Sequence, residues 1–288
     1  MSLHEVRAVV PIEAVETVDD LLLEFGDERW SVFEDIVTRT AFVLGVFEDS
    51  TEASAGWEAV SPRFEGLAVG KPEFRELADA DWRESYKLHF KPWRIGRLHW
   101  VPVWERDTYA LPAGDQVVWL DPGMAFGTGN HETTRLCVER MVELARAGVV
   151  PSSVVDAGCG SGILAISAVK LGFGAVAGFD NDPEAVRVAV ENAELNAVAD
   201  RVDFRIGDLD TGFGGRRWAL VLANIQADVL MRFAARLLAA VEPGGVLVLS
   251  GILAQENEAV RACFAAQAPD ARFEHRTLGE WSDVLVRT

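Results

Sequence analysis

A glycine-rich turn is the part of the sequence best suited to bind a small molecule. Residues 154–164 read VVDAGCGSGIL, so that Gly158, Gly160 and Gly162 follow an apolar run and precede a helical pattern. Glycines let the backbone turn tightly and approach a ligand, and the helix N-terminus offers unpaired N–H groups. Dinucleotide sites prefer G-x-G-x-x-G, but here Ile163 occupies the place of the last glycine. The turn alone is a weak indication of a nucleoside ligand, and its spacing disfavours a dinucleotide.

Two acidic residues near this turn fit such a ligand. Asp156 lies two positions before Gly158, where an acid is expected for a ligand with a cationic amino-acid end. Asp180 ends the next predicted strand, and a carboxylate there can accept hydrogen bonds from both ribose hydroxyls. Asp182 competes for this role, but Asp182-Pro183 has the pattern of a helix N-cap followed by proline. We therefore assign Asp180 to the ribose and Asp182 to the cap.

Two further segments could contribute to a ligand site: a polar residue after a later apolar run, and a loop that precedes the glycine turn in the sequence. Asn224 ends the run 220–224, where it could offer a carbonyl oxygen to an amine and an NH₂ group to a cofactor. It could equally cap the helix predicted to begin at Ala227. The glycine-studded segment 121–134 leads into a helix and could close over a ligand to exclude water, or be an ordinary connector.

The elements that would carry these residues alternate regularly from residue 153 onward. Apolar strands separated by helices predict a parallel sheet covered on both faces. The last two strands have only four residues between them, too few for a crossover helix, so they predict an antiparallel hairpin. The predicted strands are 153–157, 175–179, 202–206, 220–224, 245–250, 272–278 and 283–287, and the helices are 133–147, 163–171, 183–196, 227–241 and 256–266.

The residues before this pattern predict a separate, small α+β domain of the ferredoxin-like kind at 1–90. Its predicted elements are a strand at 6–12, a helix at 13–25, two strands within 30–47, a turn or helix start at 48–55, a strand at 74–77 and a short helix at 81–90. We expect residues 91–120, with strand-like pieces at 98–104 and 116–120, to form a linker. Residues 121–288 would then form the cofactor-binding domain.

The charge of the chain is negative and uneven. Residues 1–80 hold 18 acidic and 6 basic side chains, a net charge of −12 out of −18 for the whole chain. Such a surface repels nucleic acid and attracts a basic protein, although acidic surfaces also simply keep proteins soluble. We therefore expect a basic protein as partner and no direct contact with nucleic acid.

Other features of the composition predict a soluble protein without a metal site. No apolar run is long enough to cross a membrane, and the N-terminus lacks the pattern of a secretory signal. Cys137, Cys159 and Cys263 have no metal-ligand spacing, and histidines are few and scattered. We expect no metal ion and a reducing, cytoplasmic location.

Taken together, these segments resemble the PrmA family, the methyltransferases that modify the eleventh protein of the large ribosomal subunit. The distinctive match is the AFGTG loop at 125–129, which is not a general methyltransferase feature. The similarity runs from about Asp81 to the end, and before Asp81 only the layout is similar. The matching stretches are 156–164, 178–183, 223–225 and 121–134, supported by 81–82, 89–92 and 279–281.

The resemblance implies a fold, a cofactor and a substrate. It implies a class I methyltransferase Rossmann-like domain that binds S-adenosylmethionine through Thr134, Gly158, Asp180 and Asn224. It also implies that the small N-terminal domain captures the ribosomal protein and is joined by a flexible linker to the catalytic domain. The products would be methylated lysine side chains and a methylated N-terminal amine.

The sequence departs from the family pattern at three positions. Asn130 and Glu132 stand where the family usually has threonine and proline, and Gln226 replaces a common apolar residue. The acidic Glu132 could alter cofactor closure or the choice of substrate.

The implied reaction is an in-line displacement by a neutral amine. A lysine amine has a pKa of about 10.4, and desolvation in an apolar pocket lowers it without a dedicated base. We therefore predict no nucleophile: Cys159 fills space between glycines, and His131 is structural or solvated rather than a proton acceptor. Asn224 is the predicted catalytic residue. It is followed by Ile225-Gln226 rather than the Pro-Pro-Tyr common in enzymes that methylate planar nitrogens, which favours an aliphatic amine.

Three hypotheses follow from the sequence. The first is a methyltransferase of the ribosomal protein, and the second is a methyltransferase of another basic protein or a small amine. The third, an oxidoreductase that binds a nucleotide, is disfavoured by the spacing of the glycines.

Overall fold

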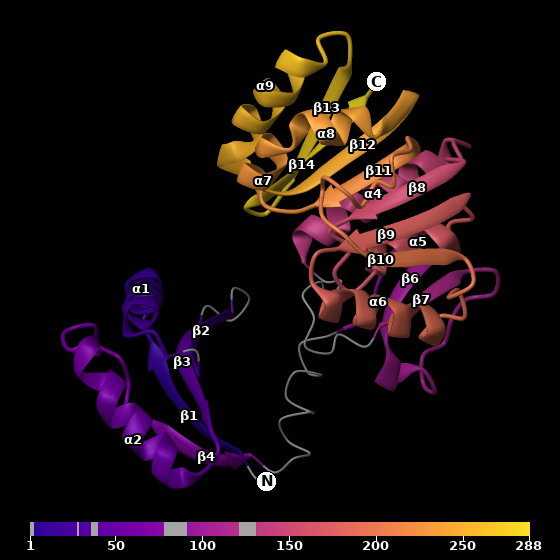
Figure 1. Ribbon diagram of the computed structural model, residues 1–288. Coiled ribbons are helices and arrows are strands. Elements are labelled where there is room, and N and C mark those ends of the chain that lie inside the picture. Colours follow the sequence, from indigo (N-terminus) through magenta and orange to yellow (C-terminus); the bar gives the residue numbers. More distant parts are fainter. Residues whose placement is uncertain (1–2, 28, 36–39, 78–90, 121–130) are drawn as a thin grey trace. The chain divides into compact units, whose positions relative to one another are not determined.

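The structure is a computed structural model of residues 1–288, and it describes residues 3–27, 29–35, 40–77, 91–120 and 131–288. The chain divides into two compact units, Met1–His89 and Phe90–Thr288, which are described separately (Figure 1).

The first unit is a four-stranded antiparallel sheet covered by two helices. Its sheet has the order β2-β3-β1-β4, and both helices share one hydrophobic core with it. This β-α-β-β-α-β arrangement is the ferredoxin-like topology that the sequence predicts. The elements are β1 (Leu3–Val10), α1 (Val15–Phe25), β2 (Trp30–Asp35), β3 (Thr40–Phe47), α2 (Ser50–Val60) and β4 (Glu73–Leu77), with short 3-10 turns at Ile12–Ala14 and Ser61–Phe64.

Local signals fix the ends of both helices of this unit. Helix α1 ends at Gly26, which adopts a left-handed conformation with φ 73° and donates its N–H to Leu22. Helix α2 begins after Asp49, whose carboxylate accepts hydrogen bonds from the N–H groups of Thr51 and Glu52. The polar segment 48–55 is thus the start of a helix. The short helix predicted at 81–90 lies outside the described residues.

The second unit contains a seven-stranded sheet of order β10-β9-β8-β11-β12-β14-β13 (Figure 1). Its first five strands are parallel, and β14 runs antiparallel to both β12 and β13, as the hairpin prediction requires. The strands are β8 (Ser153–Ala157), β9 (Ala175–Asp180), β10 (Val202–Ile206), β11 (Trp218–Asn224), β12 (Val241–Leu253), β13 (Arg272–Leu278) and β14 (Trp281–Arg287).

Helices cover both faces of this sheet because its strands are apolar on both sides. Val154 and Leu220 join one core with α4, α5 and α6, whereas Val155 and Val221 join a second core with α7, α8 and α9. The predicted helix 227–241 is interrupted at Phe233 and forms two short helices. The helices are α4 (Glu132–Arg146), α5 (Ile163–Lys170), α6 (Pro183–Leu195), α7 (Ala227–Arg232), α8 (Ala234–Ala239) and α9 (Asn257–Gln267), with a 3-10 turn at Ala254–Glu256.

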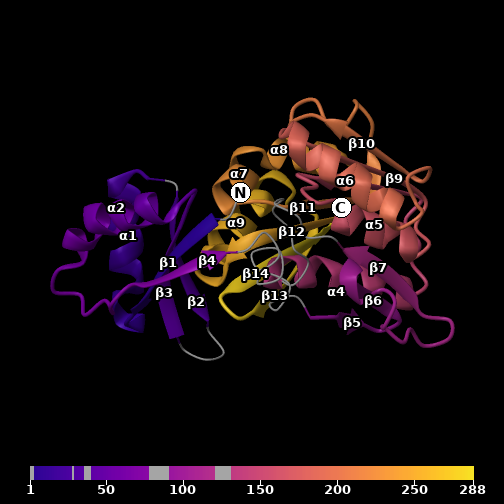
Figure 2. The same cartoon turned by 90° about the horizontal axis from the view of Figure 1, so that it is seen from below.

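Residues 91–120 differ from the expected linker. They form a three-stranded sheet of β5 (Trp93–Ile95), β6 (Leu98–Pro102) and β7 (Gln116–Leu120), with a 3-10 turn at Val103–Glu105, and this sheet lies beside α4, α5 and α6 (Figures 1 and 2). Trp100 is fully buried, and its Nε1 donates to Ser167 Oγ of α5 at 3.0 Å. Because its apolar side chains enter the core under α4 and α5, this segment belongs to the second unit.

Candidate functional site

The predicted site residues lie where the strand order of the large sheet reverses. From β8 the chain continues to β9 and β10 on one side, and it then crosses to β11 and β12 on the other side. In open α/β sheets, ligands bind at the carboxyl ends of the strands beside such a reversal. The glycine turn follows β8, while Asp180 and Asn224 end β9 and β11. The sheet topology therefore brings these residues to one edge.

The backbone of the turn requires its glycines. Gly158, Gly160 and Gly162 have φ values of 73°, 50° and 76°, a region that side chains other than glycine rarely adopt. A Cβ atom at Gly162 would lie 2.7 Å from Cζ of Phe204 and 3.0 Å from Cβ of Ala189. The third glycine thus allows the turn to pack closely against β10 and α6.

Asp180 is fixed by the turn that it faces. Its Oδ2 accepts the N–H of Gly160 at 2.9 Å, and its Oδ1 accepts the N–H of Asp182 at 3.1 Å. A carboxylate has about four acceptor positions, so capacity remains for two hydroxyl groups. Asp182 caps α6 by accepting the N–H of Glu184 at 2.8 Å, which confirms the predicted division of roles as far as the cap is concerned.

Asp156 is a buried carboxyl group with an unpaired oxygen. It is only 1% exposed, and its Oδ2 accepts the N–H of Ala165 at 3.2 Å, while its Oδ1 has no partner among the described residues. Burial is the main cause that raises the pKa of Asp156 to about 8; the Ala165 N–H opposes this rise, and the negative charge of Asp180 adds to it. A cationic ligand group would satisfy this orphaned oxygen, so the residues present fit a ligand with an ammonium end.

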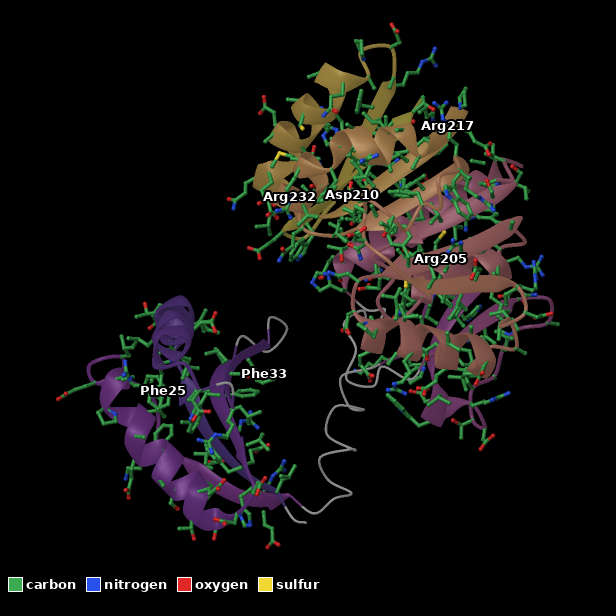
Figure 3. The ribbon with its side chains drawn as sticks, viewed as in Figure 1. Phe25, Phe33, Arg205, Asp210, Arg217 and Arg232 are labelled. Carbon is green, nitrogen blue, oxygen red and sulfur yellow. The ribbon has the colours of Figure 1, made fainter. Side chains whose placement is uncertain are left out.

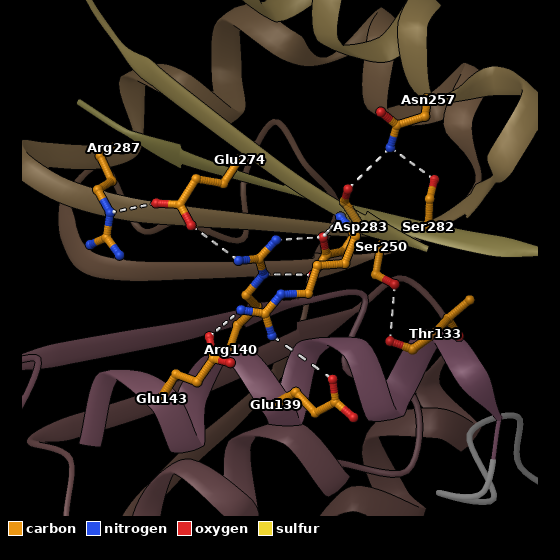
Figure 4. A network of polar contacts seen from close by, with 11 residues as sticks. Thr133, Glu139, Arg140, Glu143, Ser250, Asn257, Glu274, Ser282, Asp283 and Arg287 are labelled. Atoms are coloured by element: carbon orange, nitrogen blue, oxygen red, sulfur yellow. Dashed lines mark hydrogen bonds and ion pairs between the residues drawn. The ribbon is translucent and has the colours of Figure 1, made fainter. Parts of the chain in front are cut away.

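Asn224 and Thr134 are brought together through strand β12. Asn224 lies opposite Ser250 in the β11–β12 ladder, and Ser250 Oγ donates to the carbonyl of Thr133 at 2.9 Å (Figure 4). Thr134, which is 2% exposed, follows in the first turn of α4. A Cβ atom on Gly158 would lie 2.7 Å from the Cγ2 atom of Ile225, so the turn also contacts the end of β11.

The alternative role of Asn224 as a helix cap is not seen. The N-cap position of α7 is Gln226, and no side chain makes a capping hydrogen bond there. In the part of the chain that the structure describes, the side chain of Asn224 has no hydrogen-bond partner, and it is half-buried at the strand end.

His131 and Cys159 have structural surroundings. His131 caps α4, because its Nδ1 accepts the N–H of Thr133 at 3.4 Å, and its ring packs edge-on against Trp281. Burial raises the pKa of the Cys159 thiol, which disfavours a reactive thiolate. The preceding loop at 121–130, Asn130 included, lies outside the described residues.

The described ranges contain neither a cluster of metal-binding side chains nor a helix suited to a membrane. These residues contain no group of three or more His, Cys, Asp or Glu side chains that could hold a metal ion. In the same part of the chain, no helix is both long and apolar enough to cross a bilayer.

A buried polar network behind the site was not predicted. Arg140 of α4 donates from Nε and Nη2 to the two carboxylate oxygens of Asp283 in β14 at 2.7 and 2.8 Å, and both residues are almost fully buried (Figure 4). The only signal in the sequence is a charged residue within the apolar face of α4. Nothing local identifies its partner, because Asp283 follows Arg140 by 143 positions.

Comparison with known proteins decides the family. The chain matches the family described as "Ribosomal protein L11 methyltransferase (PrmA)" over residues 3–288. This chain belongs to the PrmA family. A relative from Geobacter sulfurreducens, named ribosomal protein L11 methyltransferase, is 40% identical, and the match covers 98% of this chain and 97% of that protein. A relative of the same name from Pelobacter propionicus is 45% identical over 77% of this chain and 71% of that protein.

A solved structure supports the assignment to the PrmA family. The ribosomal protein L11 methylase of Lactobacillus delbrueckii subsp. bulgaricus is 32% identical, with a TM-score of 0.60 over 69% of this chain and all of that chain. The predicted fold class and family are therefore confirmed. As a member of the PrmA family, the protein is a methyltransferase that uses S-adenosylmethionine, and the oxidoreductase hypothesis is wrong.

Proposed function

We propose that this protein transfers methyl groups from S-adenosylmethionine to lysine side-chain amines and the N-terminal amine of ribosomal protein L11. The observation that carries the proposal is the family match along residues 3–288, which includes the first unit as well as the cofactor fold. Relatives named for this substrate share both units, since the Geobacter sulfurreducens match covers 98% of the chain.

The strand ends of the second unit supply the proposed cofactor contacts. We assign the ribose hydroxyls to Asp180, which the Gly160 N–H already orients. The turn formed by Gly158, Gly160 and Gly162 would approach the nucleoside with its backbone, as its positive φ angles allow. Bound S-adenosylmethionine supplies an electrophilic methyl group.

The remaining assignments concern the amino-acid end of the cofactor and the incoming amine. Asp156 would accept the cationic end with its unpaired Oδ1, and Thr134 lies in the helix turn beside the ends of β11 and β12. Asn224 is the proposed catalytic residue, because its unpartnered amide oxygen can accept a hydrogen bond from an amine and so orient its lone pair.

The amine must be neutral when it reacts, and this site needs no strong base for that. An apolar, water-excluding pocket lowers the pKa of a lysine from about 10.4 by disfavouring its charged form. His131 is used as a helix cap, and the thiol of Cys159 has a raised pKa. Holding the amine and the methyl group in line accounts for much of the rate, on the order of 7–11 kcal/mol in favourable cases.

The first unit, which we equate with the proposed domain at 1–90, would capture the ribosomal protein. Residues 1–80 have a net charge of −12, which attracts a basic protein. The sheet of this unit also exposes apolar side chains. Phe33 on β2 (Figure 3) is 49% exposed and stacks on Phe42. Phe74 on β4 is 50% exposed. Exposed apolar side chains on a unit of net negative charge suit a folded basic protein better than a nucleic acid.

We place this reaction in the cytoplasm. All three cysteines, Cys137, Cys159 and Cys263, are free thiols, which suits a reducing compartment. A cytoplasmic enzyme would also meet the ribosomal protein as it is made.

The direct test is mass spectrometry of purified ribosomal protein L11 after incubation with the enzyme and S-adenosylmethionine. We expect methyl additions on lysines and on the N-terminal amine, and far fewer in the same time with an enzyme that carries Asp180→Ala, when the cofactor concentration is below saturation. An unmodified ribosomal protein, together with methylation of another basic protein or of a small amine, would favour the second candidate. Other amines should be tested beside the ribosomal protein because Glu132 departs from the family pattern. Its side chain lies close to Gly279 of the terminal hairpin.

A further inference from the structure

Ser250 occupies a junction between the two elements that hold Asn224 and Thr134. It is completely buried near the end of β12, directly opposite Asn224 in β11. Its backbone carbonyl accepts the N–H of Ile225 at 3.2 Å, and its hydroxyl donates to the carbonyl of Thr133 at 2.9 Å. One residue thus binds the segment after Asn224 with its backbone and the turn beside Thr134 with its side chain.

Helix α4 is bonded to the sheet at more than one position along its length, and Ser250 makes the bond at the first turn, which carries Thr134. Farther along the helix, Arg140 makes a two-bond ion pair with Asp283 of β14 (Figure 4). At the first turn, the hydroxyl of Ser250 in β12 donates a hydrogen bond to the Thr133 carbonyl of α4. Removing that hydroxyl would leave the helix attached by Arg140 and by the packing of His131 on Trp281, while the Thr133 carbonyl would lose its bond to β12.

We propose that Ser250 is a positioning residue for cofactor binding, which fixes Thr134 relative to Asn224 through its hydrogen bond to Thr133. This inference rests on the proposed function, since it takes Thr134 and Asn224 as cofactor contacts. Ser250 itself is 0% exposed, so its effect on the cofactor would be exerted through these neighbours.

The test is the dissociation constant for S-adenosylhomocysteine, measured by calorimetry on full-length wild type and variants. Ser250→Ala removes the buried hydrogen bond to the Thr133 carbonyl and the contact with the Cys137 thiol, and we expect about fivefold to tenfold weaker binding. Ser153→Ala is the matched control, because Ser153 is also buried and lies at the start of β8, the strand end opposite the glycine turn, where its hydroxyl accepts the N–H of Ala219. It should lower the melting temperature and leave the dissociation constant unchanged.

A double-mutant cycle separates positioning from general stability. If Ser250 acts through Thr134, then Ser250→Ala combined with Thr134→Ala should weaken binding by much less than the product of the two single effects. Ser153→Ala combined with Thr134→Ala should show no such coupling. In turnover assays, Ser250→Ala should raise KM for S-adenosylmethionine and leave KM for the ribosomal protein unchanged.

Each outcome decides the inference. Binding by Ser250→Ala that equals wild type, or losses that multiply in the cycle, would overturn it. If Ser250→Ala does not fold, Ser250→Cys keeps the shape with a weaker donor and should show a smaller loss of affinity in the same cycle. A wild-type protein that binds no cofactor would instead overturn the proposed function, and this inference with it.

Discussion

The two units of the protein differ in how their charge is placed. Residues 1–89 hold 20 acidic and 8 basic side chains, and residues 90–288 hold the other 25 and 19. The second unit thus places arginines such as Arg205, Arg217 and Arg232 among its acids (Figure 3). In the first unit, charge acts as a broad field, whereas in the second unit single carboxylates are held by specific bonds. We therefore expect small, cumulative effects on substrate binding when acids of the first unit are neutralised. In the second unit, we expect a large effect on cofactor binding from single carboxylates.

The largest effect is expected at Asp180. Asp180→Ala removes the proposed acceptor of both ribose hydroxyls, and each hydrogen bond to a charged group contributes about 1.5–3 kcal/mol, so cofactor affinity should fall by about 100-fold or more. Calorimetry with S-adenosylhomocysteine measures this directly.

The neighbouring acid Asp182 is the matched control. Asp182→Ala removes the cap of α6, which should cost about 1 kcal/mol of stability without a comparable loss of affinity. Equal affinities for Asp180→Ala and wild type would show that the ribose partner is misassigned.

Asp156 should give a smaller effect with a characteristic dependence on pH. Because its pKa in the folded protein is raised from 3.8 to about 8, the folded state holds a proton that the unfolded state has lost across this range. Its contribution to stability is therefore present below about pH 4 and is lost as the pH rises toward 8.

The variant Asp156→Asn stays neutral at every pH, so it should be more stable than wild type near pH 8 and differ less near pH 4. It should also bind S-adenosylhomocysteine more weakly, because it cannot pair with a cationic group. Urea unfolding at the two pH values measures the first effect, and a wild type and variant with identical pH dependence would contradict the account.

The smallest effect on substrate binding is expected when a few acidic side chains on the surface of the first unit are neutralised. Glu58 and Glu65 are exposed in the first unit, and changing both to Gln should raise KM for the ribosomal protein a few-fold at low salt, with the difference shrinking at high salt. Cofactor affinity should not change. The matched control changes the exposed Glu258 and Asp270 of the second unit to Gln and Asn. If the control pair raises KM equally, the first unit has no special role in capture.

The sequence was most informative where structure is determined locally. Strands β8, β10 and β13 have the predicted bounds, because apolar or alternating runs there end at turn residues. The glycine turn and the Asp182 cap were predictable for the same reason: each depends on a few consecutive residues.

Features that depend on distant contacts were not predictable. Trp100 is placed in the core by its contact with Ser167, 67 positions away. Because nothing near Trp100 in the sequence indicates this contact, the pattern of 91–120 predicted a linker. The pairing of Arg140 with Asp283, and the bond from Ser250 to Thr133, join residues more than a hundred positions apart. A single sequence gives the residue types of such pairs but not their partners.

The most direct test is a crystal structure of the protein with bound S-adenosylhomocysteine. The account predicts the nucleoside across the turn at Gly158–Gly162, with both ribose hydroxyls within hydrogen-bond distance of the Asp180 carboxylate. A ligand bound elsewhere, or a ribose directed away from Asp180, would contradict it.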